Sequence, residues 1–153
     1  MSRNILIDTV RISGFRGIKN LEMTLPRVAV LIGSNNSGKT SLLKALQLAL
    51  GDYSRSISEE DFFIDPDENR VNEINVDVRF VPVDADGNRA KVFNDVWLTE
   101  FGDKIKAEAN GNQFMALRTR VKPNEIKGGF ECTRFIMQTW PEFAVWLDEK
   151  PKE

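Results

Sequence analysis

The residues with the clearest chemical potential form one continuous run. They are Gly33, Ser34, Asn35, Asn36, Ser37, Gly38, Lys39 and Thr40. This run matches the phosphate-binding pattern G-x-x-x-x-G-K-[ST] at every fixed position. Gly33 and Gly38 allow the backbone to curl tightly around phosphate oxygens. Backbone N–H groups and the positive end of a following helix would then face a common point, which makes an anion site.

The side chains of this run have distinct expected roles. Lys39 is expected to bind the β- and γ-phosphates, Thr40 to ligate Mg²⁺ through its hydroxyl, and Ser41 to reach the α-phosphate. The cofactors expected are therefore ATP and Mg²⁺. The predicted nucleotide-binding residues of the run are Gly33, Asn35, Asn36, Ser37, Gly38, Lys39, Thr40 and Ser41. The pattern identifies no catalytic residue.

The elements around the run are those that such a site requires. Residues 28–32 read Val-Ala-Val-Leu-Ile, the apolar and partly β-branched composition of a strand buried on both faces. Residues 41–50 are good helix formers, and Gly51 marks the expected helix end. The alternative, an ordinary turn before a buried helix, explains neither the Lys-Thr pair nor both flanks.

The composition excludes several kinds of chemistry. The 153 residues are 41% apolar and 29% charged, which is typical of a globular domain. The absence of histidine excludes Ser-His-Asp catalysis and histidine-ligated zinc in this chain. Cys132 is the single cysteine, which fits a reducing cytosol, and neither a signal peptide nor a membrane-spanning run is evident. We therefore expect a cytoplasmic protein with no membrane contact.

The residues before the run predict two strands. Residues 4–13 form one strand, the Gly14-Phe15-Arg16-Gly17 segment breaks it, and residues 21–25 alternate as a half-buried second strand. The phosphate loop is therefore preceded by an antiparallel pair.

Together these segments resemble a known family. Residues 10–18, 21–25 and 30–46 look like the N-terminal lobe of ABC-type ATPase heads. Within those they are most similar to the RecF/SMC-like group, and especially to the OLD-family (overcoming lysogenisation defect) ATP-dependent endonucleases. The segment from Ser58 to Phe63 also resembles the one that follows the first helix in that family. The strong similarity covers residues 4–64.

The resemblance implies a fold, partners and one further site residue. The fold is α/β, a P-loop NTPase with the ABC/SMC-type N-terminal lobe and an antiparallel β subdomain. The partners are ATP, DNA through the full-length protein, and a second head in a homodimer. By this resemblance Arg16 lies near the nucleotide phosphates, although an ordinary solvated turn arginine is an equal alternative.

The remainder of the chain predicts the β subdomain. Residues 74–80 alternate as a strand, Phe93 to Phe101 have helical spacing that ends at Gly102, and Asn110-Gly111 is a hairpin signal. Residues 113–122 and 130–139 read as a strand pair. We expect one partial ATPase head over 1–153, with a P-loop lobe at 1–64, a β subdomain with one helix at 70–140 and a short tail at 141–153. Residues 4–25 and 73–139 would together build the antiparallel sheet.

Several charged groups have two interpretations. A set of basic side chains on the strand pair could form a face for DNA, but exposed positions on a half-buried sheet are the favoured explanation. They are Arg118, Arg120, Lys122 and Arg134. The segments Asp65–Asn69 and Asp84–Asn88 resemble metal loops but lack the spacing of one, so both are interpreted as solvated turns.

Two motifs that a complete ATPase head needs have only weak counterparts. Asp148-Glu149 resembles a Walker B pair and Gly128-Gly129 a signature loop, but the first follows a short helical pattern after Pro141 and the second lies between strands. No nuclease (Toprim-like) domain is present. We therefore expect an N-terminal fragment of a longer protein.

The function that follows is ATP and Mg²⁺ binding for an OLD-like endonuclease, in DNA repair or phage defence, with DNA cleavage outside this chain. The chain alone is expected to bind ATP but hardly to hydrolyse it. The main alternative is a RecF/SMC-like DNA-repair or chromosome-maintenance ATPase without a nuclease. A P-loop phosphotransferase such as a small kinase is a third, disfavoured by the N-terminal hairpin.

Overall fold

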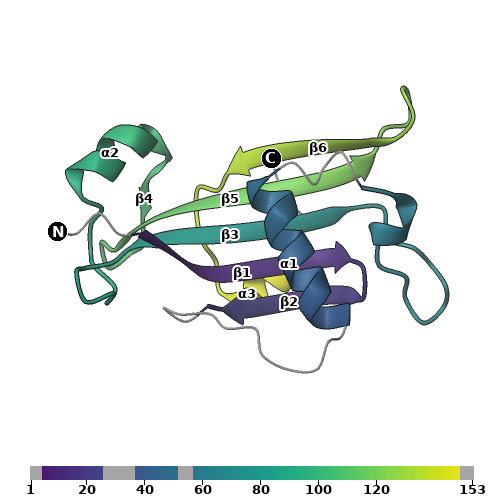
Figure 1. The fold of residues 1–153 in the computed structure, drawn as a ribbon, viewed down its shortest axis with the longest axis horizontal. Coiled ribbons are helices and arrows are strands. Elements are labelled where there is room, and N and C mark those ends of the chain that lie inside the picture. The colour runs from purple at the N-terminus through teal and green to yellow at the C-terminus, as the bar shows by residue number, and fades with distance from the viewer. Residues whose placement is uncertain (1–4, 26–36, 52–56, 149–153) are drawn as a thin grey trace.

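The computed structural model describes residues 5–25, 37–51 and 57–148, and for residues 37–40 the backbone alone. Its main feature is a twisted antiparallel sheet of six strands (Figure 1). The strands are β1 (Ile5–Phe15), β2 (Ile18–Thr24), β3 (Ile74–Pro82), β4 (Lys106–Ala107), β5 (Gln113–Pro123) and β6 (Phe130–Ile136). They run in the order β2-β1-β3-β5-β4, and β6 also pairs with β5.

The described residues form three α-helices around the sheet. They are α1 (Ser37–Leu50), α2 (Asp95–Phe101) and α3 (Phe143–Asp148), with 3₁₀ turns η2 (Glu59–Asp61) and η3 (Gly102–Lys104). In Figure 1, α1 crosses one face of the sheet, α3 lies behind the opposite face, and α2 lies beyond the end near β4. No helix formed by the described residues has the length and apolar composition that a membrane crossing requires.

The face under α1 is an apolar core. The helix buries one stripe, Leu42, Ala45, Leu48 and Ala49, each at most 3% exposed. Their spacing of three to four residues places them on one side of a helix. Every second residue of β1 and β3 meets this stripe, because successive side chains of a strand point to opposite faces. The strand residues of this core include Val10, Ile12, Ile74, Val76 and Val78.

The opposite face of the same strands is charged and nevertheless buried. Asp77 of β3 is fully buried and accepts two hydrogen bonds from Arg118 of β5, at 2.8 and 2.7 Å. A third bond, 2.8 Å long, comes from the indole Nε1 of Trp146 in α3. Because all three donors converge on one carboxylate, α3 is fixed to the middle of the sheet.

Arg11 of β1 is covered on this face by aromatic rings. Its guanidinium carbon lies 4.2 Å from the ring centre of Trp140, 5.7 Å from that of Phe143 and 5.9 Å from that of Trp146. Its Nε donates to Glu22 at 2.8 Å, whereas its buried Nη1 has no hydrogen-bond partner among the described residues. Stacking on the rings therefore replaces part of the hydration that Arg11 has lost.

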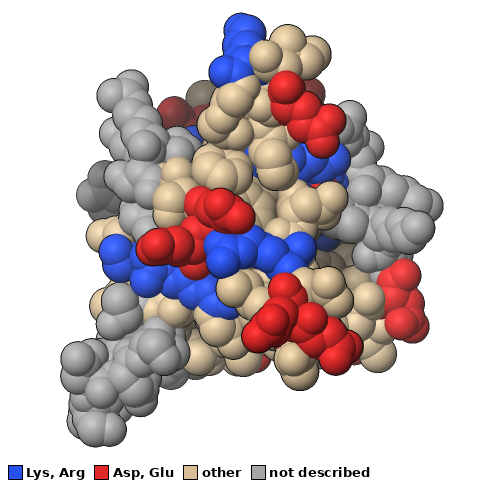
Figure 2. Space-filling view, turned by 90° about the vertical axis from the view of Figure 1, so that its right-hand side faces the viewer, with Lys and Arg blue, Asp and Glu red and all other residues tan. Residues whose placement is uncertain are grey.

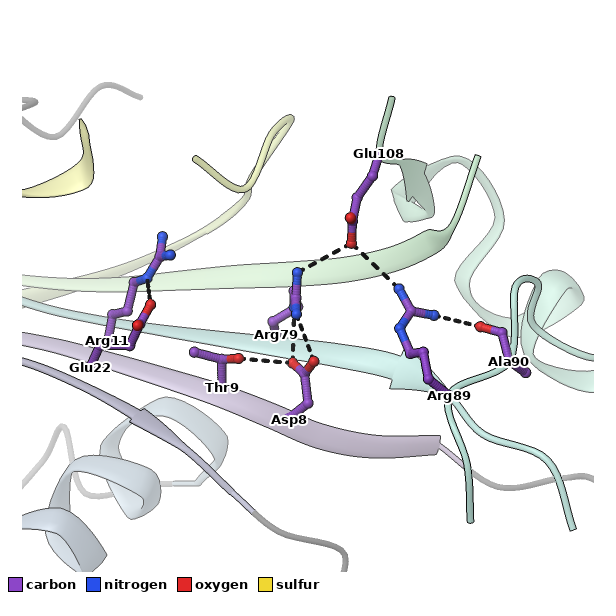
Figure 3. Close-up of polar contacts among 8 residues, drawn as sticks. All are labelled: Asp8, Thr9, Arg11, Glu22, Arg79, Arg89, Ala90 and Glu108. Atoms are coloured by element: carbon purple, nitrogen blue, oxygen red, sulfur yellow. Dashed lines mark hydrogen bonds and ion pairs between the residues drawn. The ribbon is translucent and has the colours of Figure 1, made fainter. Parts of the chain in front are cut away.

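Arg79 continues this charged face toward β4 (Figure 3). It binds both carboxylate oxygens of Asp8, at 2.9 and 2.6 Å, and contacts Glu108 at 3.2 Å. Burial alone lowers the pKa of Arg79, but the hydrogen bonds and charges of these carboxylates outweigh it and hold the pKa above its usual value. Burial lowers the pKa of Arg89, which shares Glu108 at 3.5 Å. Arg79 therefore remains charged while largely enclosed.

Most of the elements predicted from the sequence are confirmed. The helix at 41–50, the strand at 74–80, the helix that ends at Gly102 and the two strands after Gly111 are all present. The antiparallel sheet does combine residues 4–25 with residues 73–139. The predicted strand at 28–32 lies outside the described residues.

The interpretation of Gly14 as a strand breaker is wrong. β1 continues through Gly14 to Phe15, and the chain turns only at Arg16 and Gly17. Gly14 has φ +76°, and a Cβ atom there would lie 2.4 Å from the backbone oxygen of Glu73. The glycine permits a close backbone approach inside the sheet rather than ending the strand.

The two acidic loops are turns, as predicted. Asp65 Oδ1 accepts the backbone N–H groups of Asp67 and Asn69, both at 2.9 Å, and Asp84 Oδ1 does the same for Asp86 and Asn88. The first carboxylate of each loop therefore holds its own backbone.

Candidate functional site

The N-terminal end of α1 is the candidate anion site. The backbone of Ser37, Gly38, Lys39 and Thr40 forms the first turn of this 14-residue helix. The first N–H groups of a helix have no partner inside it, and the helix dipole is positive there. No acidic residue occupies the first turn. The start of α1 is therefore suited to a phosphate group.

Most predicted phosphate-binding residues lie outside the described part of the structure. Gly33, Asn35 and Asn36 precede it, and the side chains of Ser37, Lys39 and Thr40, which were predicted to bind nucleotide and Mg²⁺, lie outside it as well. Ser41 is described, and its side chain is buried. The roles assigned to these residues stay predictions.

A basic side chain binds the C-terminal end of α1. The guanidinium Nη2 of Arg134, in β6, donates to the backbone oxygens of Leu48 and Gly51, at 2.8 and 2.7 Å. These carbonyls end the helix, where a positive charge is favourable. Arg134 thus binds the negative end of α1 and connects it to β6.

Arg16 lies at the turn between β1 and β2. Figure 1 shows this turn at the same end of the sheet as the first residues of α1. Phe15, beside Arg16, belongs to the same buried core cluster as Leu42 of α1 and Phe62. Arg16 has φ +55°, a left-handed conformation that is uncommon outside glycine. The turn is therefore specifically shaped and packed close to the candidate site.

A carboxylate that had no role in the sequence argument contacts Arg16. The Nε of Arg16 lies 3.0 Å from Asp61 Oδ1, and the backbone N–H of Arg16 donates to the backbone oxygen of Asp61 at 2.6 Å. Arg16 is therefore a partly exposed turn residue held by an ion pair, and neither of its two interpretations is excluded by this contact. Contact with phosphate stays a prediction. The one signal of Asp61 in the sequence is its place three residues after Ser58, the spacing of a capping box.

The four basic residues of the strand pair do not form a DNA-binding face. Arg118 and Arg120 are 8% and 5% exposed, so both the DNA interpretation and the solvated interpretation are wrong for them. Arg118 is bound to Asp77, and Arg120 lies 3.8 Å from Glu73 and 4.9 Å from the ring centre of Phe135. Of the other two, Lys122 is exposed near Glu73, and Arg134 binds the end of α1.

At the end of the molecule that carries the β1–β2 turn, the described residues present charges of both signs. Figure 2 views this end and shows a band of Lys and Arg side chains bordered closely by Asp and Glu side chains. Charges of both signs alternate over short distances there.

The two weak counterparts of ATPase motifs have the local structures that were predicted. Gly128 and Gly129 form the turn between β5 and β6, with φ +76° and +71°, and no helix begins after them. Asp148 is the last residue of α3, and Glu149 lies outside the described residues. Residues 143–148 are helical, so the strand that precedes a Walker B pair is not present there.

Comparison with known proteins gives a family and a fold. The family model described as "Protein of unknown function (DUF2813)" matches residues 5–114. A solved structure described as "Structural biochemistry of ATP-driven dimerization and DNA stimulated activation of SMC ATPases" is similar over 93% of this chain and 75% of that chain. The TM-score is 0.52 and the sequence identity 16%. At this identity the similarity concerns the fold alone.

Curated relatives match shorter segments. The uncharacterized protein YbjD of Escherichia coli is 42% identical over 64 residues, 40% of this chain and 12% of that protein. The OLD nuclease of Thermus scotoductus is 31% identical over 74 residues, 46% and 14% of the two chains. The DNA replication and repair protein RecF of Listeria welshimeri is 38% identical over 60 residues, 38% and 16%.

The matched parts thus span only 12–16% of these relatives. Together the matches confirm the resemblance to the N-terminal segment of an OLD/RecF-like ABC-type ATPase, and the ABC/SMC-type α/β fold.

Proposed function

The chain belongs to the DUF2813 family, and from that premise we propose that it is the ATP- and Mg²⁺-binding N-terminal part of an OLD-like, ATP-dependent endonuclease acting on DNA. The observation that carries the proposal is the start of α1. A G-x-x-x-x-G-K-T run leads into a helix whose first turn has no acidic residue, and whose apolar stripe is packed firmly on a sheet. Such a helix end is fixed in position and ready to bind phosphate.

The proposal assigns roles within the run. Backbone N–H groups from Gly33 to Gly38 surround the phosphates, Lys39 neutralises the β- and γ-phosphates, and Thr40 ligates Mg²⁺. In the whole protein, two heads would dimerise in response to ATP, and a nuclease domain outside this chain would cleave DNA. The division into a P-loop lobe at 1–64, a β subdomain at 70–140 and a tail at 141–153 belongs to the proposal, as does a cytosolic location.

Calorimetric titration with MgATP tests the binding. Lys39→Ala is expected to weaken binding at least about tenfold, because it removes a charged hydrogen bond to phosphate. Lys104→Ala is the matched control, since Lys104 is an exposed lysine of η3, next to α2 at the other end of the sheet. Equal affinities of the wild type and Lys39→Ala would remove Lys39 from the site.

Slow turnover is the second part of the proposal. Phosphoryl transfer needs a positioned water and charge stabilisation beyond the phosphate cradle, and Asp148-Glu149 is the pair that resembles the Walker B residues needed for this. Steady-state phosphate release by this chain is expected to be negligible, with or without DNA. Robust release that Glu149→Gln abolishes would identify Asp148-Glu149 as a true Walker B pair and overturn this part.

A RecF/SMC-like ATPase without a nuclease is the second candidate, and the match to RecF favours it as directly as the match to the OLD nuclease favours the first. The sequence that follows this segment in the whole protein separates the two. An acidic Toprim cluster there would indicate a nuclease, and a long heptad repeat a coiled-coil ATPase.

A further inference from the structure

Asp61 is a buried carboxylate with a charged partner in the β1–β2 turn. Its side chain is 5% exposed, whereas the side chain of Arg16, 3.0 Å away, is 30% exposed. A carboxylate is costly to bury unless it is paired and hydrogen-bonded. The two partners therefore differ in kind, since one is an enclosed anchor and the other a partly exposed group attached to it.

The anchor is held on several sides. Asp61 Oδ2 accepts the backbone N–H of Ser58 at 2.9 Å, and the backbone N–H of Asp61 donates to the oxygen of Ser58 at 3.0 Å. Its own backbone oxygen accepts the N–H of Arg16 at 2.6 Å. Beside it Phe62 pairs with Phe15, and Phe63 donates to the oxygen of Gly14 at 2.9 Å. Asp61 is thus fixed both to its own turn and to the end of β1.

This arrangement determines where the guanidinium of Arg16 can lie. An arginine has several rotatable bonds and loses considerable entropy when it is immobilised. Asp61 Oδ1 lies 3.0 Å from its Nε, and this ion pair keeps the guanidinium beside the buried carboxylate. The left-handed backbone at Arg16 and the bond from its N–H to Asp61 limit the remaining freedom.

We infer that Asp61 is a positioning residue that preorganises Arg16 for the phosphates of a nucleotide bound at the start of α1. The inference rests on the proposed function. Asp61 touches Arg16 and not the ligand, so it acts by reducing the entropy that Arg16 loses on binding.

MgATP titrations of a small set of variants test the inference. Asp61→Asn preserves the volume but removes the charge and one acceptor, and is expected to weaken MgATP binding about tenfold. Glu60→Gln is the matched control, because Glu60 is an exposed acid in the same 3₁₀ turn, and it should leave the affinity within about twofold. Arg16→Ala is expected to lose at least as much affinity as Asp61→Asn.

The double variant separates positioning from a general structural role. In an Arg16→Ala background, Asp61→Asn should cause no further loss of affinity, because there is no guanidinium left to position. A full additional tenfold loss in that background would overturn the inference. Arg16→Lys gives a second route should Asp61→Asn fail to fold. Lysine keeps the charge but cannot engage Asp61 and a phosphate through one planar fork, so weaker MgATP binding is expected and wild-type affinity would overturn the inference.

The Lys39→Ala variant distinguishes the two possible failures. If Lys39→Ala weakens binding while Asp61→Asn matches the wild type, only the role of Asp61 is overturned. If the wild-type chain does not bind MgATP, the proposed function is overturned together with the inference.

Discussion

The two faces of the sheet are closed in opposite ways. On one face, α1 presents Leu42, Ala45 and Leu48 to aliphatic residues of β1 and β3. On the other face, Arg11, Asp77, Arg79 and Arg118 are enclosed by the segment that carries Trp140, Phe143 and Trp146. The same strands thus have an apolar side and an ionic side, and both are shielded from water.

The two faces differ in the substitutions that they tolerate. Burial of apolar surface is non-directional and scales with area, so the α1 face accepts side chains of similar volume. The ionic face depends on individual partners, because a buried charge without its partner is strongly destabilising. Each buried charge can be satisfied in few ways, and this fixes the position of α3 on the sheet more narrowly than packing alone would.

The largest expected effect is on the ionic face. Asp77→Ala removes a carboxylate that accepts from Arg118 and from Trp146, and should lower the free energy of unfolding by about 3–5 kcal/mol in urea titrations. The double variant Asp77→Leu/Arg118→Met removes both charges and should recover most of that loss. A double variant as unstable as the single one would show that packing, not the buried charge, dominates this face.

A smaller effect is expected on the apolar face. Leu48→Ala truncates a fully buried side chain on the sheet-facing side of α1 and should lower the free energy of unfolding by about 3 kcal/mol, as large-to-small core substitutions do. Leu43→Ala, on the same helix but 46% exposed, is the control and should cost less than about 1 kcal/mol. Similar losses for the two leucines would contradict the assignment of α1's buried stripe.

The smallest effect concerns the aromatic cover of the ionic face. Trp140→Leu keeps an apolar side chain but removes the ring over Arg11 and should cost about 1 kcal/mol. A double-mutant cycle with Arg11→Met isolates the ring–guanidinium contact from other losses. A coupling energy near zero would reduce the rings to a hydrophobic cover without specific attraction to the cation.

The sequence predicted the apolar face well and the ionic face poorly. Alternation in residues 74–80 assigns Val76 and Val78 to the core and Asp77 and Arg79 to the other side, and that assignment is right. Local patterns equate the polar side of a strand with solvent. The enclosure of that side depends on residues 140–146 returning across a sheet whose partners lie far away in sequence, and no local signal encodes such a return.

For the candidate site too, one part could be predicted from the sequence and another could not. The loop run and the helix after it are recognisable because their chemistry and local structure lie within one short stretch. The contact between Arg16 and Asp61 joins a hairpin turn to a segment beyond α1, so the sequence singled out Arg16 but neither Asp61 nor the pairing of the two. The capping-box spacing from Ser58 to Asp61 indicates a turn and gives no information on what the second oxygen binds.

The place of β1 between β2 and β3 has a consequence for synthesis. Ile5 pairs with Pro82, so α1 leaves the ribosome well before β3, the strand that completes the surface beneath it. At the usual rate of synthesis, about 5–20 residues per second, β3 is completed a few seconds after the apolar stripe of α1. Pairings this distant in sequence also slow folding itself. During that interval the nascent chain presents the leucines of α1 without their cover, and this is the stage at which it is most open to chaperones and to aggregation.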